Sequence, residues 1–500
     1  METASREANP AVPQVVDTLI VGAGFGGLCM GIALDKADRG DWLILEKGQE
    51  VGGTWRDNQY PGAACDVQSH LYSYSFAPKA DWSRRYAGWD EIQRYILDVT
   101  ARYGLRSRIR FGREVVAATW DEAAARWTLQ TADGARFVCR QWVLASGPLH
   151  VPAMPDIPGL ERFAGPVWHS ARWRHDVDLA GKRVASIGSG GSAIQYVPEI
   201  APRAGHVTVF QRTPAWVIPR DMRRYPRWRQ RLFAAAPWLR ALHRARLYWS
   251  NESRVWPLFH PALARLIQPL VAWSMRRQVR DPALAARLVP DYTIGCKRIL
   301  ISNEWLKAFN RDNVDLVTAR IAEITPTGVV TADGREHPAD VLILGTGFVV
   351  DPRLYMKDFT LSGRAGHRIG TDWAQTPTAY LGISMAGYPN MFQLVGPHTA
   401  LGHNSIIFMI EAQVQFIVAA LRERERRHAD SIDVRPEAQA DFLAGVRRGL
   451  AGTVWESGCK SWYQAADGTN FTLWPGATWR YWLACRNPEW AHFSFAGRDA

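Results

Sequence analysis

A glycine-rich turn after a short apolar strand constrains the fold of this chain more than any other feature. Residues 15–21 (VVDTLIV) lead directly into Gly22-Ala-Gly24-Phe-Gly26-Gly27, and a helical stretch over residues 28–37 follows. A second strand over residues 42–45 ends at Glu46, which lies 24 residues after Gly22. A strand, a glycine turn, a helix and an acid in this order and spacing are typical of a dinucleotide-binding α/β fold.

Each part of this motif has a mechanical reason. Gly22 permits the tight turn, Gly24 lets the backbone approach a pyrophosphate, and Gly27 lets the helix pack on the strand. The helix N-terminus offers free N–H groups to the phosphates, and the acid can accept hydrogen bonds from ribose hydroxyls. The predicted contacts of this first nucleotide are Gly22, Gly24, Phe25, Gly26, Gly27, Glu46 and Lys47.

The same pattern recurs in the middle of the chain. Residues 183–187 form the strand, Gly188-Ser-Gly190-Gly-Ser-Ala193 forms the loop, and a helix runs to about residue 200. The next strand, residues 206–210, leads to Arg212, again 24 residues after the first glycine. The predicted contacts of this second nucleotide are Gly188, Ser189, Gly190, Ser192, Ala193, Arg212 and Thr213.

The residues that end the two patterns differ in charge. Glu46 suits a ribose with a free 2′-hydroxyl, as in FAD, whereas Arg212 suits a 2′-phosphate, as in NADPH. We therefore predict an α/β protein with two dinucleotide-binding (Rossmann-like) domains, FAD in the first and NADPH in the second. This combination indicates a flavoprotein that is reduced by a pyridine nucleotide.

Two small-residue turns indicate where the chain passes between these domains. Residues 143–147 (VLASG) and 343–347 (ILGTG) each end a strand, and Thr346 and Gly347 are predicted cofactor contacts. Residues 147–159 contain four prolines and form a stiff linker. We assign residues 1–148 and 377–500 to the FAD domain and residues 149–218 and 293–376 to the NADPH domain. Asn404 and Ser405 are predicted to cap a helix that runs to about residue 422.

A basic helical insert, residues 219–292, interrupts the second domain. Between residues 220 and 290 the chain has 15 arginines, no lysine and three acids, so this segment carries the net charge of +12. The charge is too localised for a nucleic-acid-binding surface, and we predict no nucleic-acid partner. We favour a solvated helical excursion whose arginine stems cover apolar surface. The alternative is a patch that touches an anionic membrane or a partner. The insert also contains Trp228, Trp238, Trp249, Trp256 and Trp273.

Composition narrows the class of protein further. A chain of 500 residues with 47% hydrophobic residues fits about three globular domains. The N-terminal METASREANP lacks the apolar region of a secretory signal, and no apolar run of about 18 residues could span a membrane. We expect the six cysteines to be reduced thiols of a cytoplasmic protein, with no metal site. The run RERERR, residues 422–427, indicates solvated charge.

The spacing of the cysteines also decides between two uses of a flavin. Disulfide reductases share the two-nucleotide plan, but they carry C-x-x-C or C-x4-C beside the flavin. This chain has neither pattern. The main remaining use of the flavin is therefore oxygen activation for the oxygenation of a substrate.

Three segments resemble type I Baeyer–Villiger monooxygenases. Residues 52–66 (GGTWRDNQYPGAACD) fit the family's long fingerprint [AG]GxWxxxx[FY]P[GM]xxxD, and residues 163–173 (FAGPVWHSARW) fit its short fingerprint FxGxxxHxxxW. Trp173 favours this family over flavin-containing monooxygenases, which have Tyr or Phe there. Arg174 departs from the family's usual Pro or Asp. Residues 295–298 (GCKR) resemble the segment that carries the family's active-site arginine.

This resemblance implies an FAD- and NADPH-dependent oxygenation of ketones to esters or lactones through a flavin C4a-peroxide, with sulfoxidation as a side reaction. It assigns catalytic roles to Arg298, Asp66 and His169, and it pairs Lys297 with Arg212 at the NADPH 2′-phosphate. A flavin-containing or N-hydroxylating monooxygenase acting on amines or sulfides is the alternative. A membrane-docked nucleotide-binding regulator without catalysis is a rival from another class. The resemblance places these further residues at FAD: Thr54, Trp55, Asp66 and Tyr72.

Overall fold

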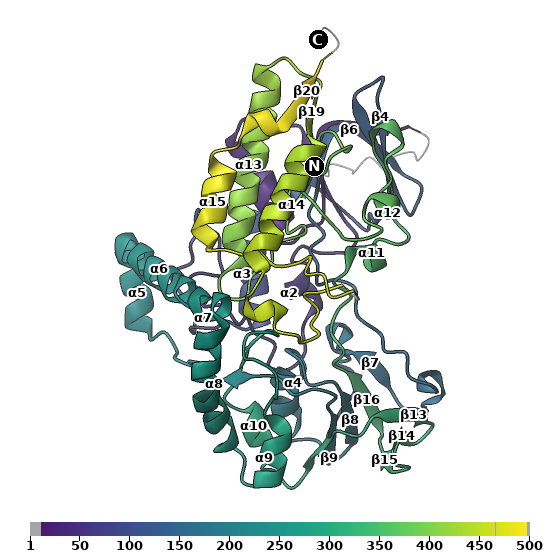
Figure 1. Cartoon of the computed structure of the whole chain (residues 1–500), viewed down its shortest axis with the longest axis vertical. Helices are drawn as coiled ribbons and strands as arrows, with labels where there is room; N and C mark the ends of the chain where they lie inside the picture. Colours follow the sequence, from purple (N-terminus) through teal and green to yellow (C-terminus); the bar gives the residue numbers. More distant parts are fainter. Residues whose placement is uncertain (1–11, 466, 498–500) are drawn as a thin grey trace, which may run out of the picture.

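The computed structural model describes residues 12–465 and 467–497 and has a large β-sheet in each half of the molecule, mixed in the first half and parallel in the second (Figure 1). The first sheet lies in the upper half of the view and the second in the lower half. The N-terminal METASREANP segment lies outside the described residues. Two nucleotide-binding folds were predicted, and both are present.

The first sheet has the strand order β17-β4-β5-β6-β1-β2-β3, and β18 also pairs with β6. Strand β1 (Gln14–Val21) lies in its interior and is parallel to β2 (Trp42–Glu46) and to β6 (Arg136–Leu144). Strand β1 pairs on both sides and contributes side chains to two apolar cores, which explains the buried Val16, Leu19 and Ile20. Helices α1 (Phe25–Lys36) and α13 (Ile406–Arg426) pack together against it in one core. The other strands of this sheet are β3 (Ile109–Phe111), β4 (Val115–Asp121), β5 (Arg126–Thr131), β17 (Thr360–Ser362) and β18 (Met391–Gln393).

The second sheet is entirely parallel and has the order β12-β9-β8-β16-β7. Its central strand β8 (Arg183–Ile187) leads through the second glycine turn into α4 (Ala193–Ile200), as predicted. A three-stranded antiparallel sheet lies beside it, made of β13 (Ile321–Thr325), β14 (Gly328–Thr331) and β15 (Glu336–Pro338). The remaining elements are β7 (Val167–His169), β9 (His206–Phe210), α10 (Trp305–Ala308), β12 (Val314–Val317) and β16 (Val341–Leu344).

The insert is helical, as predicted, and forms one side of the molecule, on the left in Figure 1. It leaves the second domain after β10 (Val217–Ile218) and returns before β11 (Leu300–Ile301), and these two strands pair with each other. No helix in residues 12–465 and 467–497 is long and apolar enough to cross a membrane. The insert helices are α5 (Arg227–Ala235), α6 (Pro237–Glu252), α7 (Val255–Phe259), α8 (Pro261–Arg276) and α9 (Pro282–Leu288).

One predicted domain boundary is placed too late in the chain. Strand β17 pairs with β4, so residues 360–362 belong to the first sheet rather than to the NADPH domain. The chain crosses back between Gly347 and β17, a stretch that contains only the short helix α11. The elements outside the two sheets and the insert are α2 (Thr54–Asp57), α3 (Trp89–Arg102), α11 (Pro352–Tyr355), α12 (Ile369–Asp372), β19 (Ser431–Val434), α14 (Pro436–Leu450), α15 (Thr478–Arg486) and β20 (Phe493–Ala496).

Three predictions about side chains are wrong. Cys296 and Cys459 form a disulfide across a sequence separation of 163 residues, whereas the other four cysteines are buried thiols. Arg424, in the run RERERR, is fully buried and donates to the side-chain oxygen of Gln141. Burial lowers the pKa of Arg424 to about 10. Ser405 is the first residue before α13, but its hydroxyl donates to the Leu71 carbonyl rather than capping the helix.

Candidate active site

The turn between β1 and α1 accepts only glycine at two positions. Gly22 has φ +107°, and a Cβ there would lie 2.7 Å from the Ala145 carbonyl oxygen. At Gly27 a Cβ would lie 1.9 Å from the Gly22 carbonyl oxygen, so the helix could not pack this closely on the strand. By contrast, a Cβ at Gly24 would meet only Gly53, at 3.9 Å. The space in front of Gly24 is therefore open, as a pyrophosphate site requires.

Glu46 lies at the end of β2, beside this turn. Its carboxylate is buried and accepts hydrogen bonds from the backbone N–H groups of Ala23 (2.8 Å) and Gly48 (2.7 Å). The guanidinium of Arg56 donates to the same carboxylate at 2.7 Å. The acid is thus fixed next to the helix N-terminus, whereas Lys47 is exposed.

Three aromatic side chains surround the start of α1. The indole N–H of Trp55 donates to the Tyr72 hydroxyl at 3.2 Å, and the two rings are perpendicular with centroids 5.6 Å apart. Phe25 contacts Tyr72 edge to face at 5.4 Å. Burial raises the pKa of Tyr72 well above its ordinary value. These predicted FAD residues therefore come together, with Thr54 at the first position of α2.

The second glycine turn repeats the first one. Gly188 has φ +109°, and a Cβ there would lie 2.4 Å from the Gly345 carbonyl oxygen. A Cβ at Gly190 would meet nothing within 4 Å, so the space before α4 is open. The hydroxyl of Ser189 donates to the Thr213 carbonyl at 3.4 Å. Ser192 and Ala193 form the start of α4.

Arg212 and Lys297 are near enough for the charge of one to act on the other. Burial lowers the pKa of Lys297, the Arg212 cation lowers it further, and Asp291 opposes both effects. Arg212 is exposed at the end of β9, and the Lys297 ammonium lies 4.8 Å from the centre of the Tyr292 ring. Neighbouring like charges favour a bound anion between them. This arrangement suits a phosphate group.

Asp66 and Arg298 form an ion pair although 232 residues separate them in the sequence. Arg298 Nε donates to Asp66 Oδ2 at 3.0 Å, and Nη2 donates to the same oxygen. The side chain of Arg298 is 38% exposed and that of Asp66 is 32% exposed, so a small molecule can reach both. The Asp66 carboxylate raises the pKa of Arg298, which keeps the guanidinium positive. The pair uses only part of the guanidinium's donors, so others remain for an oxygen anion.

Proteins of known identity resemble this chain over nearly its whole length. Residues 19–236 match a family described as pyridine nucleotide-disulphide oxidoreductase. A Baeyer-Villiger monooxygenase of Pseudomonas aeruginosa is 41% identical over 481 residues, which cover 95% of this chain and 91% of the relative. One of Streptomyces coelicolor is also 41% identical, over 96% of this chain and 93% of the relative. The chain belongs to the Baeyer–Villiger monooxygenase family.

Solved structures agree with this membership. A steroid monooxygenase bound to NADP is 32% identical, with a TM-score of 0.88 over 97% of this chain and all of that chain. The Rhodococcus cyclohexanone monooxygenase bound to NADP+ is 29% identical, with a TM-score of 0.87 over the same shares. An OTEMO complex with FAD and NADP is 26% identical, with a TM-score of 0.89. The two-nucleotide architecture is thus shared with Baeyer–Villiger and related flavin monooxygenases.

The family's long fingerprint joins the two domains of this Baeyer–Villiger monooxygenase. The Tyr60 hydroxyl donates to the side-chain oxygen of Gln195 on α4 at 3.1 Å. The amide of Gln195 in turn donates to the Ala64 carbonyl at 3.0 Å. Burial raises the pKa of Tyr60 to about 12, so the phenol stays protonated. Asp66 follows two residues later, so these bonds fix its position relative to the second domain.

His169 lies at the end of the edge strand β7. Its Nδ1 accepts from the Ala171 N–H at 3.1 Å, and its ring contacts Phe348 edge to face. Burial lowers the pKa of His169. The returning segment next to it is anchored by Thr346, whose hydroxyl donates to the Ala153 carbonyl at 2.6 Å. Both contacts place His169 and Thr346 at the junction between the domains.

Sequence reasoning missed two features beside Arg298. Tyr463 is fully buried there, and burial raises its pKa to about 12, while the Arg298 cation opposes the rise. The disulfide between Cys296 and Cys459 ties the segment of Arg298 to the segment of Tyr463. Neither has a sequence signal, because the last hundred residues match the family motifs only loosely. Gln195 was missed because a single glutamine on a helix carries no motif.

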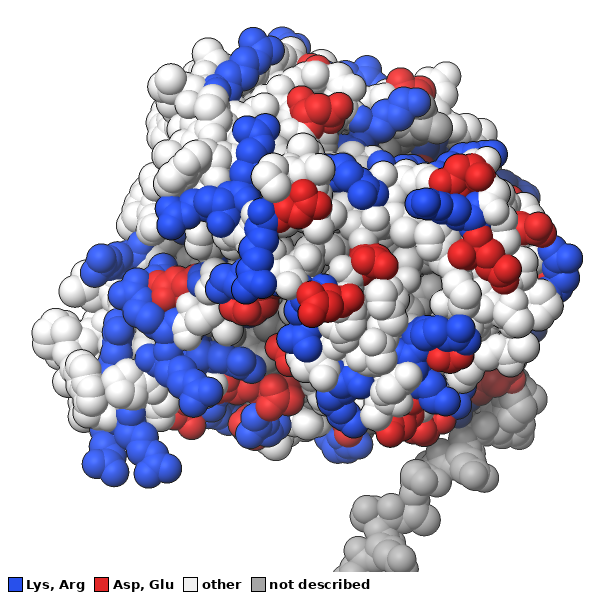
Figure 2. Space-filling view, turned by 90° about the horizontal axis from the view of Figure 1, so that it is seen from below, with Lys and Arg blue, Asp and Glu red and all other residues white. Residues whose placement is uncertain are grey.

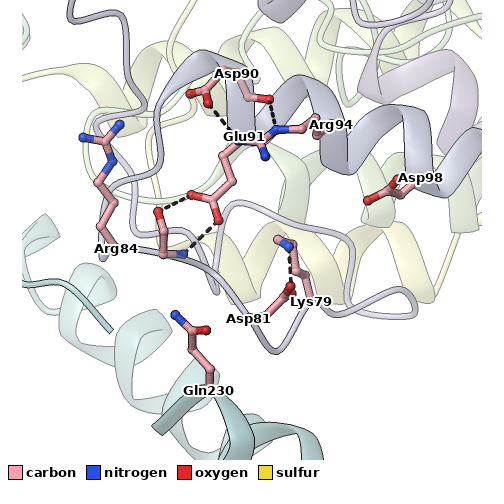
Figure 3. Close-up of a pocket in the computed structure, with 9 residues that line it drawn as sticks. Lys79, Asp81, Arg84, Asp90, Glu91, Arg94, Asp98 and Gln230 are labelled. Carbon is pink, nitrogen blue, oxygen red and sulfur yellow. Dashed lines mark hydrogen bonds and ion pairs between the residues drawn. The ribbon is translucent and has the colours of Figure 1, made fainter. Parts of the chain in front are cut away.

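A polar hollow of about 340 Å³ lies elsewhere, between α3 and α5 (Figure 3). Five of its charged groups already have protein partners: Glu91 accepts from Ser83, Lys79 contacts Asp81, and Asp90 pairs with Arg94 on α3. None of the predicted cofactor or catalytic residues is among the nine that line it. We therefore regard it as a surface depression and not as the active site.

Proposed function

We propose that this protein is an FAD- and NADPH-dependent Baeyer–Villiger monooxygenase that converts a ketone and O2 into an ester or lactone. The observation that carries the proposal is the ion pair between Asp66 and Arg298. It joins the acid of the long fingerprint to the cation of a separate motif. Two coincidental matches would have no reason to meet in space.

The two nucleotide sites fit the cofactors by their own chemistry. FAD would bind across the open space at Gly24, with Glu46 toward its ribose, and Trp55 and Tyr72 toward its ring system. NADPH would bind at Gly190, with its 2′-phosphate between Arg212 and Lys297. Relatives solved with FAD and NADP support this assignment.

FAD held by these residues would, once reduced by NADPH, supply the chemistry of O2 activation, by which one oxygen atom enters beside the ketone carbonyl and the other leaves as water. Arg298 would serve the step in which negative charge develops, first on the attacking oxygen and then on the former carbonyl oxygen. A guanidinium stays protonated at all working pH values, and it can donate to either oxygen. Removing one such donor from an oxyanion site typically costs about 3–4 kcal/mol of transition-state stabilisation.

Asp66 is proposed to hold this cation. It binds Nε and Nη2 together, which fixes the plane of the guanidinium, and it raises the pKa of Arg298. His169 and Thr346 are proposed as positioning residues at the domain junction. Through them, a movement of the second domain would change how NADPH meets the flavin.

The substrate is proposed to be a ketone, with sulfoxidation of thioethers as a side reaction. Solved relatives are named for steroids and for cyclohexanone, so a panel of steroid, cyclic and linear ketones is the proper first screen. We also propose a cytoplasmic location, because four of the six cysteines are free thiols and only Cys296 and Cys459 are paired. Oxygenation of amines or sulfides alone is the competing function, and it needs no cation at position 298.

Arg298→Ala and Arg298→Lys test the proposal. We expect Arg298→Ala to retain FAD and to bleach its flavin with NADPH under anaerobic conditions, yet to lose ester formation about a hundred-fold or more. Arg298→Lys should recover a small part, because it restores charge without the planar donors. Asp66→Ala should show a partial defect of the same kind.

The control is Arg203→Ala, an exposed arginine paired with Asp178, which should behave like the parent. Product analysis by mass, with one ketone and one amine as substrates, gives the readout. Ester formation by Arg298→Ala at the parental rate would refute the role of Arg298. If the protein converted the amine and no ketone in the panel, the proposed function would be wrong, and oxygenation of amines would take its place.

A further inference from the structure

Two helices of the insert expose apolar faces to solvent. On α6, Trp238, Leu242 and Trp249 recur at helical spacing, and all three are exposed. On α8 the same holds for the series Leu263, Leu266, Ile267, Leu270 and Trp273. The apolar stripe of a surface helix normally faces the core, with polar residues outside. On α6 and α8, by contrast, apolar side chains face the solvent.

The opposite faces of these helices are already packed on the protein. Leu247 of α6, Leu258 of α7 and Met275 of α8 are buried. Glu252, at the end of α6, accepts hydrogen bonds from Asn404 and Thr478 of the first domain. The insert is therefore held in one orientation. Its exposed stripes have no remaining surface of this chain to cover them within the described residues.

The favoured prediction of a solvated excursion does not account for the tryptophans. Arginine stems should have covered them, and Arg277 does lie over the Trp273 ring at 4.8 Å. Yet the five tryptophans of the insert remain 55–67% exposed. Several large apolar side chains exposed on one segment of the chain are typical of an interaction site.

The charge of the same surface identifies the partner. Between residues 222 and 280 there are 13 arginines, of which ten are exposed, and the single acid, Glu252, is buried; the next acid, Asp281, is exposed. Figure 2 shows basic side chains gathered beside uncharged ones on the left, the side on which α5–α8 lie in Figure 1. A second copy of the chain would bring arginines against arginines. The surface therefore selects an anionic partner.

A shallow hollow of about 300 Å³ interrupts this surface between α8 and α9. Its walls are mostly apolar, and two arginines stand at it. A hollow that combines apolar walls with guanidinium groups suits an amphiphile with an anionic head. The residues that line it are Trp273, Arg276, Arg277, Val279, Pro282 and Ala285.

We propose that the insert docks this protein on anionic phospholipid bilayers. We call the surface the Trp-Arg face, defined by Trp238, Leu242, Trp249, Leu266 and Trp273, with the arginines between them. The helices would lie in the plane of the interface, with the apolar stripes below the headgroups. Tryptophan prefers this depth, and each arginine near an anionic leaflet adds to the attraction.

Vesicle co-sedimentation of the full-length, FAD-loaded protein tests the proposal. The probes are phosphatidylcholine vesicles and vesicles of phosphatidylcholine with phosphatidylglycerol. We expect pelleting with the anionic vesicles and little with the neutral ones, and a steep decline at high salt. Arg246→Gln should lower the partition coefficient about five-fold. Trp238→Ser with Trp249→Ser should lower it about ten-fold or more.

Trp479→Ser is the matched control, because Trp479 is an exposed tryptophan on α15, outside the insert. It should bind vesicles as the parent does, and all variants should retain FAD and NADPH oxidation. Equal pelleting with both vesicle types, or no pelleting with either, would overturn the proposal. The proposal would also be overturned if the protein bound no vesicles and light scattering showed a dimer that the Trp238→Ser, Trp249→Ser variant abolished. The face would then be an interface between two copies of the chain.

Discussion

The two nucleotide-binding halves share the strand, glycine turn and helix, but they differ in whether the charged residues beside the turn already have partners in the protein. In the first half, Glu46 already accepts hydrogen bonds from two backbone amides and from Arg56. In the second half, Arg212 is exposed, and the charge of Asp291 acts on Lys297 without a hydrogen bond to it among the described residues. The first site is therefore built into the fold, whereas the second awaits an anion from its ligand.

The third glycine position extends the comparison. Gly27 has no space for a Cβ because the Gly22 carbonyl oxygen lies 1.9 Å from where it would be. Ala193 occupies the corresponding position of the second turn and is buried without difficulty. The first helix thus packs more closely on its strand than the second does. The closer packing of helix on strand is thus at the turn that we assign to FAD.

The largest effect is expected from Gly27→Ala. The new Cβ must push α1 away from β1, which costs about 3 kcal/mol or more and moves the N–H groups that face the pyrophosphate. We expect a protein purified without FAD and with a clearly lower thermal midpoint. The ratio of flavin to protein absorbance and a melting curve measure both.

The reciprocal change, Ala193→Gly, should cost only about 1 kcal/mol and should leave FAD bound. Gly190→Ala is a second control, since a Cβ there meets nothing within 4 Å. It should fold with FAD and bind NADPH less tightly. Equal losses from Gly27→Ala and Ala193→Gly would remove the distinction between the two turns.

A smaller effect is expected from Arg212→Ala, and it is confined to one cofactor. Loss of one charge-assisted phosphate contact costs about 1.5–3 kcal/mol. We therefore expect KM for NADPH to rise about ten- to a hundred-and-fifty-fold, with KM for NADH almost unchanged. Steady-state oxidation of each nucleotide gives both values. A parallel rise for both nucleotides would show that Arg212 does not bind the 2′-phosphate.

Short sequence patterns were enough to predict the two nucleotide-binding folds, but not the contacts that join the two domains. The strand at 15–21, the helix at 193–200 and the charge at Glu46 and Arg212 follow from short sequence windows. The ion pair between Asp66 and Arg298 spans 232 residues, and only the family motifs pointed to it. The contacts that hold this pair in place have no local pattern at all.

The disulfide and the buried arginine show why such features escape. Cys296 and Cys459 lie 163 residues apart with no spacing motif, so their pairing depends on tertiary structure alone. Arg424 sits in a run of six charged residues, which normally indicates a solvated helix face. It is buried instead, where Gln141 of β6 accepts a hydrogen bond from its Nη1.

The smallest effect, and the most direct test of charge satisfaction, comes from Glu46→Gln in the protein stripped of FAD. The amide keeps one acceptor oxygen but turns an NH2 group toward the N–H of Ala23 or Gly48, so one buried donor loses its partner. This should lower the free energy of unfolding by roughly 1–2 kcal/mol without any ligand. Arg212→Ala in the same apoprotein should stay within about 0.5 kcal/mol of the parent, since surface changes without partners rarely exceed that.

Denaturant melts of the FAD-free proteins measure both changes, with Glu114→Gln, an exposed glutamate, as the control for the amide substitution. The slopes of the melts must agree between variants for the midpoints to be compared. If Glu46→Gln costs nothing until FAD is added, Glu46 acts through the ribose alone. The two halves would then differ only in the charge that they offer, because neither acid nor cation would contribute to the fold before its nucleotide binds.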